Sequence, residues 1–461
     1  MNRANQIFNQ VVAALRKDGS FAQSYAIVLS GTGVNILVQI LITPIITRIY
    51  GPEAYGTYSI FNAIATNIAM VATLRFPQAL LLPPRERDFH ILMRVTVVSA
   101  LATTAITFMA FYFAATPLLK WLGAEKLIDY YFLIPLMVLL ISLNQIFGQW
   151  QYRLDKFKKS VAIDTGILIG VRVFNLSYGM LAVRNTIGLL LGDMLGKTVG
   201  LFFSWRLIIK EQIRFLFTAV SFEDFWRLVK EYKHYPIFNL PGVWATLFSE
   251  QLVVFFVSSH YGVSTLGVLS LAVSMLDLPK RLFAYTVTSV FFKKAVEVYK
   301  SSLEELQTLV LRVMYGLLAA CVLPYGLVTA FGEELFTFVF GQDWLLSGKL
   351  AQYIAIYCVF ELLYISLDSV YYVLRKERKL FAFQVATFAL RLGVMVASVQ
   401  LSLPLEECIL TLTVANSILY LSHLGYILHL LRLKWFKHLF FIVMIEASCV
   451  LFFFGLRQLF Y

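Results

Sequence analysis

Thirteen hydrophobic segments, each long enough to cross a bilayer as a helix, follow one another along almost the whole chain. A helix needs about 20 apolar residues to cross about 30 Å of hydrocarbon. Lipid offers no partners to free backbone groups, so each segment is predicted to be helical. The segments lie at 24–46, 54–82, 89–116, 128–150, 157–182, 186–208, 236–259, 264–292, 303–331, 349–374, 380–400, 407–431 and 438–458. The pattern predicts an all-α, polytopic membrane protein.

The composition supports this interpretation, because 59% of the 461 residues are hydrophobic and only 14% are charged. A soluble fold of this size would expose a large apolar surface and aggregate. The net charge of +12 does not indicate nucleic-acid binding, since its distribution along the chain has another explanation.

The positive charges concentrate in alternate loops. With the N-terminus taken as cytoplasmic, Lys and Arg on the inner side outnumber those on the outer side by about four to six to one. Clusters at 85–87, 152–159 and 375–379 are then cytoplasmic. With thirteen segments, the C-terminus is predicted to lie outside.

An internal duplication divides the chain. Tyr50–Gly56 and Tyr261–Gly267 both read YGxxxxG at an offset of 211 residues, and at the same offset the amphipathic stretch near residue 11 maps onto the one near residue 222. An even period of six segments relates two halves by an axis along the membrane normal. We therefore predict two six-helix lobes with pseudo-two-fold symmetry around a central cavity. The predicted parts are an N-terminal lobe at 1–208, a cytoplasmic linker with an amphipathic helix at 209–235, a C-terminal lobe at 236–431 and an additional span at 432–461.

Four stretches of the chain have the form of known family motifs. They are ITPIITRIYGPEAYGTYSIF at 42–61, LRFPQALLLP at 74–83, the stretch that begins at Tyr235-Pro236 and includes YGVSTLG and Leu278-Pro279, and FGQDW at 340–344. The sequence is similar to the Wzx-type branch of the multidrug/oligosaccharidyl-lipid/polysaccharide superfamily over most of residues 20–430. The resemblance implies translocation of an undecaprenyl-diphosphate-linked oligosaccharide from the inner to the outer leaflet of the bacterial cytoplasmic membrane, for O-antigen, capsule or exopolysaccharide synthesis. A thirteenth span departs from the usual twelve or fourteen.

Positive side chains within the hydrophobic segments are the candidate contacts to a lipid diphosphate. Ionisable residues at bilayer depth are costly and usually face a cavity or a partner, and Arg offers a forked donor to phosphate. Arg75 and Arg391 have no acid within a helical turn, which makes them the preferred candidates. The full set of predicted substrate-binding cations is Arg75, Arg391, Arg281, Lys280, Arg172 and Lys197.

The acids in the same segments are interpreted in two ways, as ion-coupling groups or as structural groups. The set comprises Asp164, Asp193, Glu250, Asp277, Glu361 and Asp368. The spacing of four residues in Asp193–Lys197 and in Asp277–Arg281 fits an intrahelical ion pair. Asp164 and Arg172 are eight apart, and their role stays open between the two readings. Glu361 and Asp368, seven apart on one stripe, are candidates to take up H⁺ or Na⁺ and couple a gradient to transport.

Other activities are less favoured by the sequence. A cationic interior argues against a multidrug exporter of cations, the alternative within the same superfamily. A membrane-embedded glycan polymerase or ligase usually needs a large outer loop or a mid-membrane site motif, and the longest outer loop is predicted at 332–348. The four cysteines lack metal-site or redox spacing. We expect no catalytic residue, metal or cofactor, and we expect the partners to be the lipid-linked glycan, membrane lipids and associated polysaccharide polymerase machinery.

Overall fold

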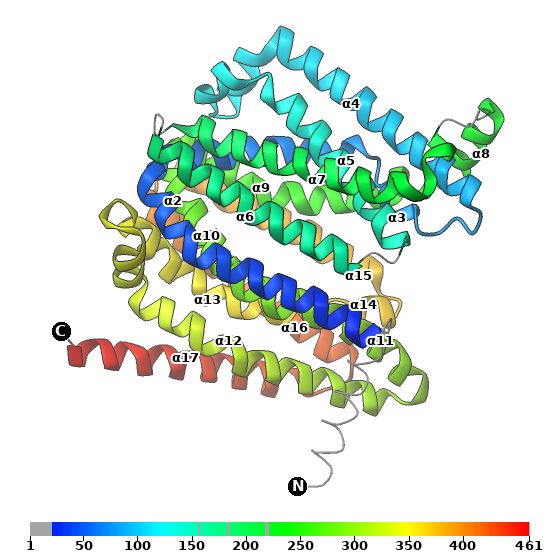
Figure 1. The fold of residues 1–461 in the computed structure, drawn as a ribbon. Coiled ribbons are helices and arrows are strands. Elements are labelled where there is room, and N and C mark those ends of the chain that lie inside the picture. Colours follow the sequence, from blue (N-terminus) through cyan, green and yellow to red (C-terminus); the bar gives the residue numbers. More distant parts are fainter. Residues whose placement is uncertain (1–20, 155–156, 182–184, 217–220, 461) are drawn as a thin grey trace. The chain divides into compact units, whose positions relative to one another are not determined.

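The computed structural model describes residues 21–154, 157–181, 185–216 and 221–460, and every regular element in them is a helix (Figure 1). Twelve of these helices are long and apolar enough to cross a membrane. This confirms the predicted all-α, multi-pass membrane protein. The amphipathic stretch expected at 5–17 lies outside the described residues.

The chain forms two compact units. One comprises residues 1–50 and 57–248, and the other comprises residues 51–56 and 249–461. The first unit contains α2 (Phe21–Ala72) except for its residues 51–56, and then α3 (Phe76–Ala79), α4 (Glu86–Trp121), η1 (Glu125–Tyr130), α5 (Leu133–Arg153), α6 (Phe157–Leu181), α7 (Thr186–Leu216), α8 (Phe222–Glu231) and η2 (Tyr235–Asn239). Helix α9 (Leu240–Tyr261) begins in the first unit and continues into the second.

The second unit continues with helices that run to the end of the chain. They are α10 (Val263–Pro279), η3 (Lys280–Ala284), α11 (Tyr285–Ser301), α12 (Leu303–Phe340), η4 (Gln342–Trp344), α13 (Leu345–Leu367), α14 (Val370–Val373), α15 (Glu377–Gln400), α16 (Leu405–Leu430) and α17 (Trp435–Phe460). Helix α17, which includes the additional span predicted near the C-terminus, lies beside α12 (Figure 1).

Three boundaries differ from the sequence prediction. Helix α2 contains the first two predicted spans as two helical arms that meet at Gly51, where φ is 72° and ψ is 174°. The span predicted at 54–82 breaks at Leu74 and Arg75, which have positive φ, because Pro77 in the next turn has no N–H with which to continue the helix. The outer loop predicted at 332–348 is also largely helical, since α12 extends to Phe340 after a kink at Phe331.

The two copies of the YGxxxxG motif contact each other. Gly51 and Gly262 both have positive φ, so each provides a sharp turn before the following helix. A Cβ atom on Gly56 would overlap the carbonyl oxygen of Val263, and one on Gly267 would overlap that of Pro52. Pro52 corresponds to Val263 at the offset of 211 residues, so the contact is itself symmetric.

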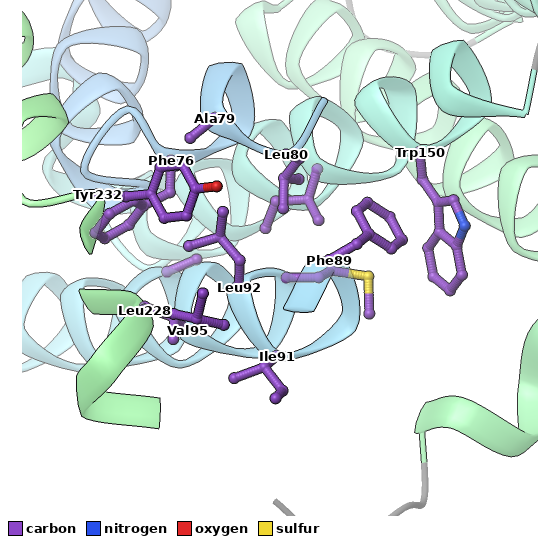
Figure 2. Packing of buried hydrophobic residues seen from close by; sticks show 13 residues of the cluster. Phe76, Ala79, Leu80, Phe89, Ile91, Leu92, Val95, Trp150, Leu228 and Tyr232 are labelled. Carbon is purple, nitrogen blue, oxygen red and sulfur yellow. The ribbon is translucent and has the colours of Figure 1, made fainter. Parts of the chain in front are cut away.

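The linker helix α8 is docked onto the first unit. The Ser221 hydroxyl accepts a hydrogen bond from the Asp224 N–H at 3.1 Å, which caps the helix. Leu228 and Tyr232 pack into the apolar cluster formed by α3, α4 and α5 around Phe89 (Figure 2). Part of the apolar face of this amphipathic helix is therefore covered by protein.

Ion pairs hold the polar side of α8 to the start of α4. Arg87 lies 2.7 Å from Asp224, and Arg227 lies 2.7 Å from Asp88. The Ser221 hydroxyl, followed by the Arg87 and Arg227 guanidiniums, keeps the pKa of Asp224 below its usual value. A lowered carboxyl pKa contributes stability above the usual aspartate range, and this contribution is lost as the pH falls through the lowered value.

Alanine at either glycine of the crossing should destabilise the fold. Gly56→Ala and Gly267→Ala each place a methyl group against backbone that cannot rotate away, and overpacking of this kind costs about 1–3 kcal/mol. Thermal unfolding of the detergent-purified protein measures the effect. Gly316→Ala in α12 is the matched control, because a Cβ there meets no atom within 4 Å. If Gly56→Ala and Gly267→Ala unfold at the same temperature as Gly316→Ala, the backbones at Gly56 and Gly267 do not approach each other closely.

Candidate functional site

A cavity within the second unit contains most of the ionisable residues predicted for that half of the chain. Its volume is about 330 Å³, and residues of α9, α10, η3, α13, α15 and α16 line it. The ionisable side chains on its wall are those of Glu250, Asp277, Lys280, Arg281, Glu361 and Arg391, and Gln251, Asn416 and Tyr357 accompany them.

Lys280 is held between two carboxylates. Its Nζ atom lies 2.6 Å from Asp277 Oδ1 and 2.6 Å from Glu361 Oε2. The ammonium group joins α10 to α13, and only 14% of its side chain is exposed. A buried ammonium ion keeps its charge only with such partners, so this contact links the two helices.

The intrahelical pair that the sequence allows between Asp277 and Arg281 does not form. Asp277 binds Lys280 instead, three residues away. The physical reason is the wide π-helical turn η3 that starts at Lys280 directly after Pro279, because it changes the angular spacing of the residues that follow. Within the described residues, Arg281 has no hydrogen-bond or ion-pair partner, and it lines the cavity.

Arg391 is a buried cation whose direct partners are neutral. Its residue is 8% exposed, its Nε donates to Asn416 Oδ1 at 3.1 Å, and its Nη2 donates to the Tyr420 hydroxyl at 3.0 Å. The Tyr420 hydroxyl in turn donates to Glu361 Oε1 at 2.9 Å. Glu361 is thus shared by Lys280 and Tyr420, and the network joins α10, α13, α15 and α16.

The charge of this cavity is balanced rather than basic. Lys280, Arg281 and Arg391 provide three cations, and Glu250, Asp277 and Glu361 provide three carboxyl groups. The cations predicted for this half of the chain are therefore accompanied by an equal number of the predicted acids. Arg281 and Arg391 nevertheless have no carboxylate partner among the described residues.

Arg75 lies in the first unit, at the break between α2 and α3. Its backbone is left-handed, with φ of 61° and ψ of 10°, and its Nε donates to Asn239 Oδ1 at 3.1 Å. Its Nη1 lies 3.6 Å from the sulfur of Met70. These partners are neutral, so Arg75 has no ion pair within the described residues, as its sequence context predicts. It ties the end of α2 to the turn before α9.

The other predicted residues of the first unit divide into a pair and two separate side chains. Lys197 lies 2.7 Å from Asp193, the intrahelical pair that the sequence allows, and the Tyr58 hydroxyl donates to Asp193 at 3.4 Å. Asp164 and Arg172 lie on α6 and are not paired with each other, and the buried Nε of Arg172 has no hydrogen-bond partner. An apolar cavity of about 650 Å³ lies between α6 and α7.

Asp368 and Glu361 do not form one site. Asp368 ends α13, where its backbone carbonyl accepts the Tyr371 N–H at 3.0 Å, and it is not among the residues that line the cavity. Sequence reasoning also missed Asn416, Tyr420 and Glu446. The spacing of four between Asn416 and Tyr420 was the available signal. Glu446 is a 7% exposed carboxyl in α17 whose Oε2 has no hydrogen-bond partner.

The model of a protein family described as polysaccharide biosynthesis protein matches residues 45–348 of the chain. No curated protein sequence matches this chain. Among solved structures, the chain is similar to the lipid II flippase MurJ in an inward closed conformation, with a TM-score of 0.68, 15% identity, and coverage of 94% of this chain and 100% of that one.

Two further solved structures share the fold. An inward-facing multidrug resistance MATE family transporter of the MOP superfamily aligns with a TM-score of 0.63 at 12% identity, covering 92% of this chain and 97% of that one. A MOP superfamily transporter from Pyrococcus furiosus, described as having a binding pocket of reverse polarity, aligns with a TM-score of 0.57 at 14% identity, with coverages of 89% and 95%. At these identities the likeness establishes a common fold.

Removal of the Lys280 ammonium should destabilise the second unit. Lys280→Met leaves Asp277 and Glu361 facing each other without a cation, and loss of one partner of a buried pair costs about 3–5 kcal/mol. The double variant Lys280→Met/Glu361→Gln should recover part of this loss, because it also removes one of the two charges left behind. Thermal unfolding in detergent measures both. Equal melting of the single variant and the unaltered protein would contradict the ion-pair geometry.

Proposed function

Because the chain belongs to the polysaccharide biosynthesis protein family, whose model matches residues 45–348, we propose that it moves a lipid-linked glycan across a membrane. The cargo in this proposal is an undecaprenyl-diphosphate-linked oligosaccharide, and the movement is from the inner to the outer leaflet of the bacterial cytoplasmic membrane. The product would serve O-antigen, capsule or exopolysaccharide synthesis, with the polymerase machinery as a downstream partner. No enzymatic step is part of the proposal.

The buried guanidinium of Arg391 carries this proposal. A cation at bilayer depth is costly, and one whose direct partners are an amide and a hydroxyl keeps most of its capacity to bind an anion. Arg391 is held in place by Asn416 and Tyr420 on the wall of a cavity that also contains Arg281 and Lys280. A diphosphate offers several oxygens to such forked donors.

The rest of the cavity is suited to the sugar portion of the cargo. Gln251, Thr413 and Asn416 provide polar groups on its wall, and Tyr357 provides an aromatic ring that stacks on Tyr420 with ring centroids 6.1 Å apart. Aromatic rings and amides of this kind bind the apolar faces and hydroxyl groups of sugars. The lipid II flippase among the structural neighbours agrees with a lipid-linked cargo.

A small-molecule exporter is the second candidate, because MATE transporters share the fold and Glu250 provides a carboxyl group on the cavity wall. The two candidates differ in cargo charge. A cationic cargo would depend on Glu250, whereas a diphosphate would depend on Arg391 and would be weakened by additional negative charge.

Loss of Arg391 should abolish glycan export. We expect Arg391→Ala to remove surface polymer from cells that depend on this chain, while Arg391→Lys retains part, because a point charge replaces the fork. Arg75→Ala should behave in the same way if Arg75 contacts the diphosphate during passage. Immunoblotting of surface glycan, normalised to the amount of membrane protein, provides the measurement. Arg312→Ala, an exposed position on α12, is the control. Normal surface glycan in Arg391→Ala cells would rule out the diphosphate role.

The proposed orientation has an independent test. With the N-terminus in the cytoplasm, reporter fusions at 85–87, 152–159 and 375–379 should report a cytoplasmic location, because their Lys and Arg residues resist translocation. Paired alkaline phosphatase and fluorescent-protein fusions at each position measure this. An outside location for any of the three clusters is incompatible with the proposed topology.

A further inference from the structure

An apolar cavity of about 650 Å³ runs along α6 and α7, which lie side by side in the first unit, and we call it the α6–α7 groove (Figure 1). Every residue that lines it is apolar. On α6 the lining extends from Ala162 to Phe174, which corresponds to about 18 Å of helix. The groove therefore follows more than half of a hydrocarbon core that is roughly 30 Å thick.

Two glycines open the α6 side of the groove. Gly166 and Gly170 line it and are exposed, and a Cβ atom on either would meet no atom within 4 Å. The axes of two packed helices are about 8–10 Å apart, so a groove along them has roughly the width of one hydrocarbon chain. The room beside the glycines also admits methyl branches. This shape fits a single branched chain better than the paired chains of a diacyl lipid.

Two cations continue the faces that line the groove. Lys159 precedes the lining residue Ile163 by one turn of α6, and Arg206 follows the lining residue Phe203 by one turn of α7. Residues three or four apart lie on the same face of a helix. Both cations therefore lie just beyond the apolar lining, at one end of the groove.

The antiparallel register of the helices brings these two cations to the same level. A Cβ atom on Gly192 would lie 3.2 Å from the ring of Phe174, and one on Gly200 would lie 3.0 Å from Ile167. Residue numbers thus rise along α7 as they fall along α6. Continued over the next two turns, this register leaves the two cations within about one helical turn of each other along the groove.

The charge at this end of the groove is positive. The side chains of Lys159 and Arg206 are exposed, and neither has an ion-pair partner within the described residues. No acid lines the groove, since Asp164 of α6 and Asp193 of α7 are not part of its wall. In the proposed orientation this end faces the cytoplasm, because Lys159 belongs to the basic cluster at 152–159.

We infer that the α6–α7 groove binds the polyprenyl diphosphate portion of the cargo, with the diphosphate at Lys159 and Arg206 and the isoprenoid chain along Gly166 and Gly170. This inference rests on the proposed function and adds a site for the lipid to the cavity proposed for the glycan. Charge-assisted contacts hold the phosphates, and the apolar wall accommodates one branched chain. The bound lipid lies in the inner leaflet, from which the proposed translocation starts.

The test is photo-crosslinking to the full chain in phosphatidylcholine nanodiscs. The probe is geranylgeranyl-diphosphate-linked N-acetylglucosamine with a diazirine at the end of its chain. Mass spectrometry should locate the label at the end of the groove away from the cations, on Val171, Phe174 and Leu195. The unlabelled diphosphate should compete for this labelling, whereas uncharged geranylgeraniol should compete weakly because it has no phosphate for the cations to bind.

Variants separate the chain from the diphosphate. Gly170→Phe fills the groove and should abolish the labelling, and its control is Gly393→Phe in α15, another exposed glycine whose Cβ atom would meet nothing within 4 Å. Lys159→Gln/Arg206→Gln should lower the affinity for the probe by about tenfold or more, because hydrogen bonds between charged groups are lost. Lys300→Gln in α11 is the matched charge control.

The outcomes distinguish this inference from the proposed function. Absence of probe binding by the unaltered chain would overturn the proposed function. Labelling confined to the second unit would overturn the present inference and leave the proposed function intact. Label near Ala162 and Phe203 instead would place the diphosphate at the wrong end and would also overturn the inference. So would displacement of the probe by an equal amount of phosphatidylglycerol, which would assign the groove to a diacyl phospholipid. Mapping of the label on the unaltered chain needs no variant.

Discussion

The contact between the Lys280 ammonium and two carboxylates is the interaction on which the second unit depends. Charged groups in a hydrocarbon environment must have partners, and this ammonium finds them on α10 and on α13. Glu361 then extends the network through Tyr420 to Arg391, and so to α15 and α16. The same side chains therefore hold the helices and line the cavity, so the charge of the cavity cannot change without a change in the packing.

The helical architecture was predictable because the bilayer allows few alternatives. Long apolar segments must be helices, and the positions of Lys and Arg alternate with them. The breaks within helices were less predictable. The YGxxxxG repeat suggested a turn at Gly51 and at Gly262, but the close crossing of Gly56 with Val263 joins residues far apart in the sequence. Nothing in a local pattern reveals such a contact.

The sequence predicted which charged residues belong to the candidate site, but it did not predict which of them form ion pairs. Lys280, Arg281, Glu361 and Arg391 were all selected for their cost at bilayer depth, and all of them line one cavity. The sequence indicated Arg281 as the partner of Asp277, but the structure pairs Asp277 with Lys280. The spacing of four residues that brings two side chains together on an α-helix does not hold in the π-helical turn after Pro279. Asn416 and Tyr420 were not predicted, because a neutral side chain at bilayer depth costs less free energy than a charged one and so does not indicate a site.

A cavity with equal numbers of cations and carboxyl groups fits transport better than one lined by cations alone. A transport site must bind its cargo firmly enough to select it and weakly enough to release it. Three unpaired cations would be costly when empty and would retain a diphosphate once bound. With the diphosphate cargo proposed above, Asp277 and Glu361 would compete with the phosphate for Lys280, and the empty and loaded states would lie closer in free energy. In that proposal the same carboxylates would lower the affinity and make release feasible.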